Sequence, residues 1–295
     1  MSTSPYKPLQ EPRSQFIDVR GLQCHVRSWG DASAQPVVLL HGSRDCSATF
    51  QFMVDNMPPG FHFIAPDLRG YGRTQWNAQG YWFADYLADL EIVLDIFAPQ
   101  GKAALVGHSL GGQLAGIYAG VRPQRIGKLV ALDAFGLIDE DAQTAPGHLA
   151  KWLDGWKRGP EASRPYETLA EMAERLQRTN PRLPLDKALF MAAESSRRRA
   201  DGLLEWSFDP LHRQPFATLY RSAEWAACMQ RIEAPTLWLA SDRVSRAERE
   251  PGGLAARMAL VRNLTFEKID DTSHNLHHDR PQEVARLVEA FLTKV

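Results

Sequence analysis

The chain has 295 residues, a length that fits one domain with an insertion better than two full domains. Hydrophobic residues make up 44% of it, charged residues make up 23%, and the formal net charge is −1. These values are typical of a soluble globular protein, and they argue against nucleic acid as a partner because the chain has no excess of basic charge.

The three cysteines, Cys24, Cys46 and Cys228, are widely spaced and odd in number. This pattern fits neither a disulfide framework nor a paired zinc motif, so we expect free thiols and a reducing, cytoplasmic location. The first fifteen residues lack the apolar stretch of a signal peptide, and no segment is long and apolar enough to span a bilayer. We therefore expect a loose N-terminal arm and no membrane partner; no pattern in the sequence defines an oligomeric state.

The first half of the chain alternates between strand-like and helix-like patterns. Residues 16–29 alternate apolar and polar side chains, which predicts a hairpin with one solvated face. Short, nearly continuous apolar runs, typical of parallel strands covered on both faces, follow at 36–42, 61–67, 103–109 and 128–136. Between them, residues 83–97 repeat apolar side chains at helical spacing until Pro99. This alternation predicts a doubly wound α/β sheet.

Residues 139–231 interrupt this rhythm with a helical, basic and tryptophan-rich stretch. Strand-like runs return at 234–241 and 264–270. Residues 281–295 then begin with proline and repeat apolar residues on one face, which predicts a C-terminal amphipathic helix.

We therefore expect one α/β core, made of residues 1–138 and 232–295, with a mostly parallel eight-stranded sheet. A helical cap of residues 139–231 is inserted after the sixth strand. Its basic run at 195–199 is interpreted as a solvated face of a cap helix, with contact to an acidic or phosphate-bearing substrate as the alternative. The cap contains large apolar side chains, most of which should hold it to the core while some should lie above the substrate site. They are Trp152, Trp156, Phe190, Met191, Trp206, Phe208, Phe216 and Trp225.

The pentapeptide GHSLG at residues 107–111 matches G-x-S-x-G, in which a serine lies on a strained turn between a strand and a helix. Here an apolar run precedes Ser109 and a helical pattern follows it. A serine hydroxyl is a poor nucleophile at neutral pH, so it needs a positioned histidine and an orienting carboxylate. His274, between the last predicted strand and the C-terminal helix, is the candidate base.

Acyl chemistry at a serine also needs two N–H groups that stabilise the tetrahedral oxyanion. The strand that ends at His41 is followed by a glycine-containing turn, so the N–H of Ser43 can face the N–H of Leu110 at the start of the helix after the serine. The residues expected around the substrate pocket are His41, Gly42, His108, Trp152 and Trp156.

The neighbouring His277 and His278 raise the question of a metal site. No cysteine or glutamate at suitable spacing completes a tetrahedral ligand set. We therefore expect these histidines to line the loop beneath the C-terminal helix, and we expect neither a metal nor an organic cofactor.

Together these motifs resemble the α/β-hydrolase fold family. The resemblance covers the core on both sides of the insertion, through LLHGSRDCSATF, APDLRGYGRT, LVGHSLGGQLAGIYA and SHNLHHDRPQEVARLVEAFL. It implies that Ser109 is the nucleophile, that His274 is the general base, and that the N–H groups of Ser43 and Leu110 form the oxyanion hole. It also implies that the insertion is a cap domain.

The position of the carboxylate that should orient His274 departs from the family pattern. The family usually places it in a glycine-containing loop after the seventh strand, where Val244 stands in this chain. Asp242 lies two residues earlier and serves if the loop is shortened. Asp133, at the end of the sixth strand and 24 residues after Ser109, resembles in its spacing the haloalkane dehalogenases that use a glutamate there. We favour Asp133 and keep Asp242 as the alternative.

The nucleophile narrows the expected chemistry. Haloalkane dehalogenases and epoxide hydrolases of this fold attack with an aspartate, so a serine favours acyl transfer through a serine ester. The resulting prediction is a serine hydrolase of the carboxylesterase type that cleaves a small apolar acyl or aryl ester. Acyltransferase, lactonase, thioesterase and carbon–carbon hydrolase activities on the same three residues are alternatives, as is a ligand-binding protein without catalysis.

Overall fold

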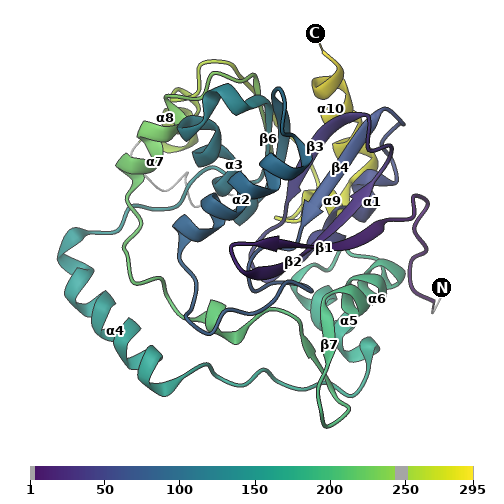
Figure 1. The fold of residues 1–295 in the computed structure, drawn as a ribbon, viewed down its shortest axis with the longest axis vertical. Coiled ribbons are helices and arrows are strands. Elements are labelled where there is room, and N and C mark those ends of the chain that lie inside the picture. Colours follow the sequence, from purple (N-terminus) through teal and green to yellow (C-terminus); the bar gives the residue numbers. More distant parts are fainter. Residues whose placement is uncertain (1–3, 243–251, 295) are drawn as a thin grey trace.

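The computed structural model describes residues 4–242 and 252–294. Its main sheet has eight strands in the order β1-β2-β4-β3-β5-β6-β9-β10 (Figure 1). Their bounds are β1 (Arg13–Val19), β2 (Leu22–Trp29), β3 (Gln35–Leu40), β4 (Phe61–Pro66), β5 (Ala103–His108), β6 (Ile126–Leu132), β9 (Thr236–Ala240) and β10 (Leu264–Lys268). The hairpin β1–β2 and the pair β2–β4 are antiparallel, and the other neighbouring strands are parallel. The predicted mostly parallel eight-stranded sheet is confirmed.

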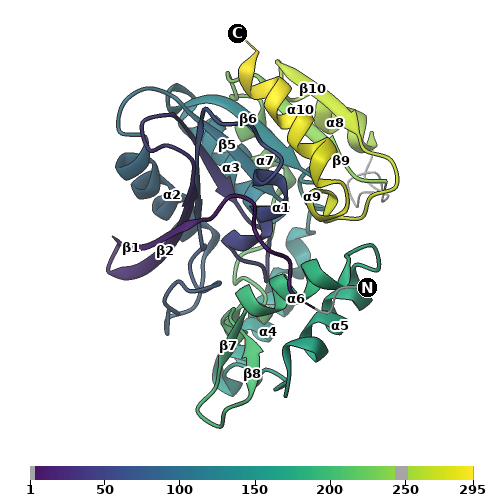
Figure 2. The same ribbon diagram turned by 90° about the vertical axis from the view of Figure 1, so that its right-hand side faces the viewer.

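Helices cover both faces of the sheet (Figures 1 and 2). One face packs against α2 (Phe83–Phe97), α3 (Leu110–Val121), α7 (Ser222–Met229) and α8 (Gly253–Met258). The other packs against α1 (Gln51–Val54), α9 (Leu276–Asp279) and α10 (Pro281–Thr293). Short 3₁₀ turns are η1 (Ser47–Phe50), η2 (Pro123–Arg125), η3 (Ala142–Thr144) and η4 (Pro210–Arg213).

Strand β3 shows why the apolar runs are continuous. Successive side chains of a strand point to opposite faces of the sheet. Val38 and Leu40 join the cluster under α2 and α3, whereas Val37 and Leu39 join the cluster under α10. All four are fully buried, so neither face leaves room for a polar residue.

The part of the chain from α4 to β8, between β6 and β9, lies at the carboxyl ends of the parallel strands (Figure 1). It contains α4 (Ala145–Arg158), α5 (Leu169–Thr179), α6 (Leu185–Glu194), β7 (Ser196–Arg198) and β8 (Leu204–Trp206). Helices α5 and α6 form a third hydrophobic cluster together with Phe52 and Cys46 of the core. This half of the cap is therefore anchored to the core by buried apolar contacts.

Two details of the cap differ from the prediction. Helix α7 lies within the predicted cap range, yet Trp225 and Met229 are buried in the core cluster beside α3, so by its packing α7 belongs to the core. The basic run at 195–199 is not a helix face, because residues 196–198 form strand β7, paired with β8. Arg197 there lies 2.7 Å from a carboxylate oxygen of Glu205 and 3.5 Å from the ring centre of Trp76.

The prediction of a loose N-terminal arm is wrong for the described residues. The Tyr6 hydroxyl donates to Asp55 at 2.8 Å, and its ring packs edge-on against Phe52. The backbone N–H groups of Leu9 and Gln10 donate to the same carboxylate. A half-buried carboxylate at the C-terminal end of α1 thus fixes a segment that carries no strand or helix pattern of its own.

All three cysteines are free, as predicted. Burial raises the pKa of Cys24 to about 12, so this thiol stays protonated at neutral pH. Among the residues that the structure describes, no helix combines the length and the apolar character needed to cross a membrane.

Candidate active site

Ser109 lies on the turn between β5 and α3, with φ 51° and ψ −114°. Such a conformation is strained for a residue other than glycine and persists only when its surroundings hold it. A Cβ atom at Gly107 would lie 2.4 Å from the carbonyl oxygen of Gly111, and one at Gly111 would lie 2.0 Å from the carbonyl oxygen of Leu40. The two glycines of the motif are thus required by close backbone approach, which lets the turn project the serine.

His274 and Asp133 complete the arrangement around this serine. Nε2 of His274 is 2.9 Å from Oγ of Ser109, and Nδ1 is 2.6 Å from Oδ2 of Asp133. The other carboxylate oxygen of Asp133 accepts hydrogen bonds from both the N–H and the hydroxyl of Ser241, each at 3.0 Å. This is the geometry that a serine nucleophile, its base and an orienting acid require.

Of the two candidate acids, the structure brings Asp133 to the histidine. Asp242 points to the surface, where its carboxylate lies 2.9 Å from Nζ of Lys268 and accepts the N–H of Asp271 at 2.7 Å. Asp242 therefore ties β10 and the start of the His274 loop to the end of β9. Val244, the usual acid position, lies outside the described residues.

Ser241 has a role that the sequence reasoning missed. It follows β9 directly, next to the end of β6 in the sheet, and it holds the carboxylate of Asp133. The available signal was its position, because the carboxyl ends of neighbouring parallel strands meet at one edge and place their next residues side by side.

Ser43 and Leu110, the predicted oxyanion residues, line the same cavity as Ser109. The N–H of Leu110 is in the first turn of α3, where no carbonyl of the same helix can accept it. His41 holds the turn that precedes Ser43. Its Nε2 accepts the N–H of Leu68 at 2.9 Å, so its Nδ1 carries the proton and donates to the carbonyl of Gly42 at 2.8 Å.

A cavity of about 710 Å³ opens above Ser109. Its aromatic walls come from both the core and the cap: Tyr71, Tyr81, Trp82, Trp152, Trp156 and Phe216. Two of the predicted pocket residues, Trp152 and Trp156, are therefore in its lining. Tyr71, Tyr81 and Trp82 follow β4 in the chain and were not predicted to line the pocket, although Tyr71 lies in the segment APDLRGYGRT that carries the family resemblance.

The prediction that His41, Gly42 and His108 line the pocket is not met. None of them is in the cavity lining, and all three are buried beneath it. His108 instead donates its Nε2–H to the carbonyl oxygen of His274 at 2.9 Å. Burial lowers the pKa of His108 well below its usual range, so the ring is neutral and acts as a support for the loop that carries the base.

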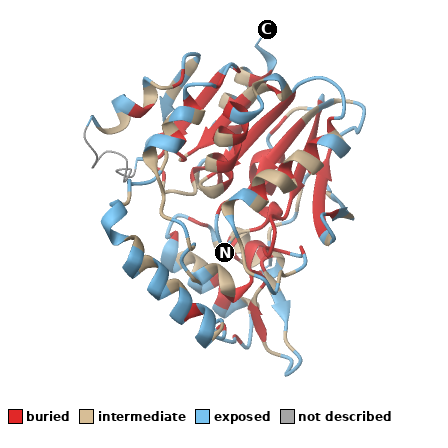
Figure 3. Cartoon of the chain, turned by 60° about the vertical axis from the view of Figure 1, so that its left-hand side comes forward, coloured by how far each residue is buried: buried red, intermediate tan, exposed pale blue. Residues whose placement is uncertain are grey.

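Helix α4 forms the outer wall of the cavity and is poorly buried (Figure 3). Only Gly155 of its residues is buried, and Trp156 is 67% exposed although it lines the cavity. The contacts that hold α4 include the packing of Trp152 against Trp82, with ring centres 6.2 Å apart, and a hydrogen bond from Gln214 to the carbonyl of Gly155. Phe190, Met191, Phe208 and Trp225 are buried in the hydrophobic clusters, and Trp206 is half-buried against them.

One wall is a stack of three rings. The imidazole of His212 lies between Tyr71 and Tyr81, with ring centres 3.9 Å and 3.8 Å away. Burial lowers the pKa of His212 to about 3, so this imidazole is neutral at physiological pH. The stack therefore presents an uncharged aromatic surface to the cavity.

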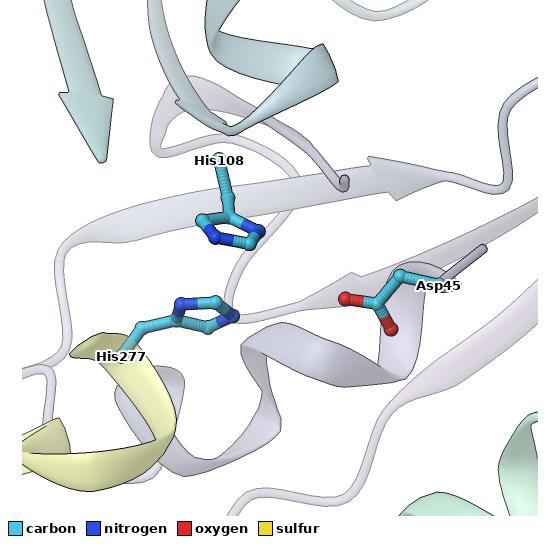
Figure 4. Close-up of side chains that lie close together, drawn as sticks. All are labelled: Asp45, His108 and His277. Carbon is cyan, nitrogen blue, oxygen red and sulfur yellow. The ribbon is translucent and has the colours of Figure 1, made fainter. Parts of the chain in front are cut away.

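A cluster of imidazoles lies behind the serine turn (Figure 4). Asp45, His108 and His277 each offer one ligand atom, and these atoms lie within 4.8 Å of one another. A zinc ion with bonds of about 2.0–2.1 Å holds its ligand atoms roughly 3.3 Å apart, so this spacing is open by comparison. His278 lies outside the set, and its Nε2 shares the Thr49 hydroxyl with Nε2 of His277.

Comparison with known proteins agrees with this fold. Residues 35–281 match the profile of the alpha/beta hydrolase fold, and the chain belongs to that family. A relative from Danio rerio described as a serine hydrolase-like protein is 26% identical over 275 residues, which cover 90% of this chain and 83% of the relative.

Two solved structures show the same fold. The thioesterase domain from the curacin biosynthetic pathway has a TM-score of 0.82 and 24% identity, and the match covers 94% of this chain and 99% of that domain. An esterase from Mycobacterium tuberculosis has a TM-score of 0.77 and 21% identity, with 98% and 94% of the two chains covered.

Proposed function

We propose that the protein is a serine hydrolase that cleaves a carboxylic ester, or a related small acyl compound, through an acyl-enzyme. The observation that carries the proposal is the continuous contact from Ser109 through His274 to Asp133, at 2.9 Å and 2.6 Å. Family membership and the similarity to the Danio rerio serine hydrolase-like protein support it. The intact contact also argues against a ligand-binding protein without catalysis.

In the first half-reaction, Oγ of Ser109 attacks the acyl carbon while Nε2 of His274 takes its proton. The N–H groups of Ser43 and Leu110 stabilise the oxyanion, and Asp133 stabilises the imidazolium. His274 then gives the proton to the departing alcohol, which leaves an ester on Ser109. In the second half-reaction a water molecule attacks this ester with His274 as the base, and the acid product leaves. Side chains, backbone groups and water supply every step.

The cavity supports a substrate with an apolar acyl or aryl group. Its volume of about 710 Å³ suits a small molecule, and its lining includes tyrosine, tryptophan and phenylalanine side chains from both the core and the cap. Trp156 lines the cavity and is 67% exposed, which supports an outer wall that is open to solvent. An open wall favours water over an added alcohol as the second nucleophile, so hydrolysis is preferred to acyl transfer. The free thiols favour a reducing, cytoplasmic location.

A fluorophosphonate probe tests the proposal, because it labels only an activated serine. We expect the wild-type protein to be labelled at Ser109 and to hydrolyse p-nitrophenyl butyrate. Ser109→Ala should show neither property while keeping the wild-type circular dichroism spectrum. Folded wild-type protein that is neither labelled nor active would contradict the proposal.

A further inference from the structure

Arg44 directly follows Ser43 in the turn that supplies one side of the oxyanion hole, and it lines the same cavity as Ser109. Its φ is 60°, in the left-handed region that residues other than glycine rarely adopt. The turn therefore holds a long cationic side chain at the reacting end of the cavity, at a position where the backbone conformation favours glycine.

The charge of Arg44 has no partner within the described residues. No ion pair or side-chain hydrogen bond of its guanidinium is found there, and Arg44 is the only lysine or arginine among the described residues of the cavity lining. The only carboxylate in that lining is Asp133, whose two oxygens already bind His274 and Ser241. Apart from these catalytic groups, the cavity carries one uncompensated positive charge.

The charge of Arg44 lies close to Ser43, whose N–H is expected to stabilise the oxyanion. Burial raises the pKa of the Tyr71 hydroxyl, and the positive charge of Arg44 opposes that effect. The same hydroxyl is 3.4 Å from Oγ of Ser43. Arg44 itself is exposed to solvent, so its guanidinium is accessible to a charged group on a substrate that enters the cavity.

The cavity lining contains a second polar group besides Arg44, the side-chain amide of Gln113. Gln113 lies on α3 one turn after Ser109 and lines the cavity. Its Oε1 is buried and has no hydrogen-bond partner within the described residues. The cavity thus combines aromatic side chains with one cation and one amide oxygen that have no side-chain partner among the described residues. The cation is available to an anionic group of a substrate, and the amide oxygen to a hydrogen-bond donor.

We propose that Arg44 binds a carboxylate carried by the substrate, so that the preferred substrates are acyl esters or thioesters with a free carboxylate, such as half-esters of dicarboxylic acids. This inference rests on the proposed hydrolase function. The planar guanidinium and a carboxylate match each other through two parallel N–H···O hydrogen bonds, which an ammonium group cannot form. Arg44 acts as a specificity residue and takes no part in bond breaking.

The test compares two ethyl esters of equal acyl length, monoethyl glutarate and ethyl valerate, with acid release followed in a pH-stat. Wild-type protein should show kcat/KM about tenfold higher for the glutarate ester, the change expected from one charge-assisted hydrogen-bonded contact. Arg44→Gln should lose this preference through a higher KM for the glutarate ester alone, and Arg44→Lys should recover only part of it. The matched control is Arg286→Gln, which removes the same charge from the exposed face of α10.

The inference is overturned if wild-type protein shows no preference for the glutarate ester. It is also overturned if Arg44→Gln lowers kcat/KM equally for both esters, because Arg44 would then act on the oxyanion that all esters share. If neither ester is hydrolysed, the proposed function fails on these substrates. Calorimetric titration of glutarate into Ser109→Ala and Ser109→Ala/Arg44→Gln protein then decides the inference: loss of binding in the double variant supports it, and equal or absent binding overturns it.

Discussion

Replacing Asp133 by asparagine tests the assignment of the acid, and the structure predicts how the variant fails. The N–H and hydroxyl of Ser241 both donate to Oδ1 of Asp133. In the variant these two donors hold the amide oxygen at that position, so the amide NH₂ faces Nδ1 of His274. Nδ1 must then be an acceptor, the proton moves to Nε2, and Nε2 can no longer take the proton of Ser109. The expected loss in kcat is about 10⁴-fold.

Asp242→Asn is the matched control, since it makes the same chemical change in the other candidate acid. It removes an exposed ion pair with Lys268, which contributes little to stability, and the amide oxygen can still accept the N–H of Asp271. We expect kcat to change little, because the contacts of Asp242 are with Lys268 and Asp271 and not with His274. Steady-state hydrolysis of p-nitrophenyl butyrate measures both variants, with thermal unfolding as a check on folding. Similar losses in the two variants would refute the assignment.

Three further substitutions probe the turn, the pH response and the cavity. Gly111→Ala places a Cβ 2.0 Å from the Leu40 carbonyl oxygen and should cost about 3 kcal/mol in urea unfolding, whereas Gly147→Ala, with open space around it, should cost nothing. The burial of Asp67 disfavours its charged form, but hydrogen bonds from His25 and from the N–H of Arg73 outweigh this effect and lower its pKa. The charged carboxylate therefore stabilises the fold above pH about 4, and this stabilisation is lost as the pH falls below that value. Urea unfolding between pH 7 and 3 should show a weaker pH dependence for Asp67→Asn, and equal slopes would contradict this. Trp152→Ala should raise KM for p-nitrophenyl butyrate severalfold with little change in kcat, and Trp156→Ala, whose ring is mostly exposed, should change KM less.

The sequence predicted the sheet and the strained serine turn because each depends on local pattern. Strands buried on both faces must be apolar throughout, and the serine turn needs glycines at fixed spacing because the backbones of Gly111 and Leu40 approach closely. The sequence could not decide the acid, since Asp133 and Asp242 follow neighbouring parallel strands. The choice depends on a single alternation at the end of β9, where Ser241 points inward and Asp242 points out.

The same alternation explains the error at His108. Its side chain leaves the end of β5 on the side opposite to the cavity, although it is adjacent to Ser109 in the sequence. The N-terminal arm was mispredicted for a different reason. Tyr6 and Gln10 are ordered by the carboxylate of Asp55, more than forty residues away, and no local pattern reports such a contact.

The division between core and cap also indicates how reactivity and specificity are separated in this protein. Ser109, Asp133, Ser241 and His274 follow β5, β6, β9 and β10, which are adjacent in the sheet, so their relative positions are fixed by the buried strands. Helix α4, in contrast, supplies two tryptophans to the cavity while only Gly155 is buried. Substitutions on α4 can therefore reshape the cavity without moving the serine or its base. The labelling rate of Ser109 with a small fluorophosphonate should stay constant across α4 variants whose KM values for bulky esters differ. The labelling rate depends on the strands that position Ser109 and His274, whereas KM for a bulky ester depends on the α4 side chains in the cavity.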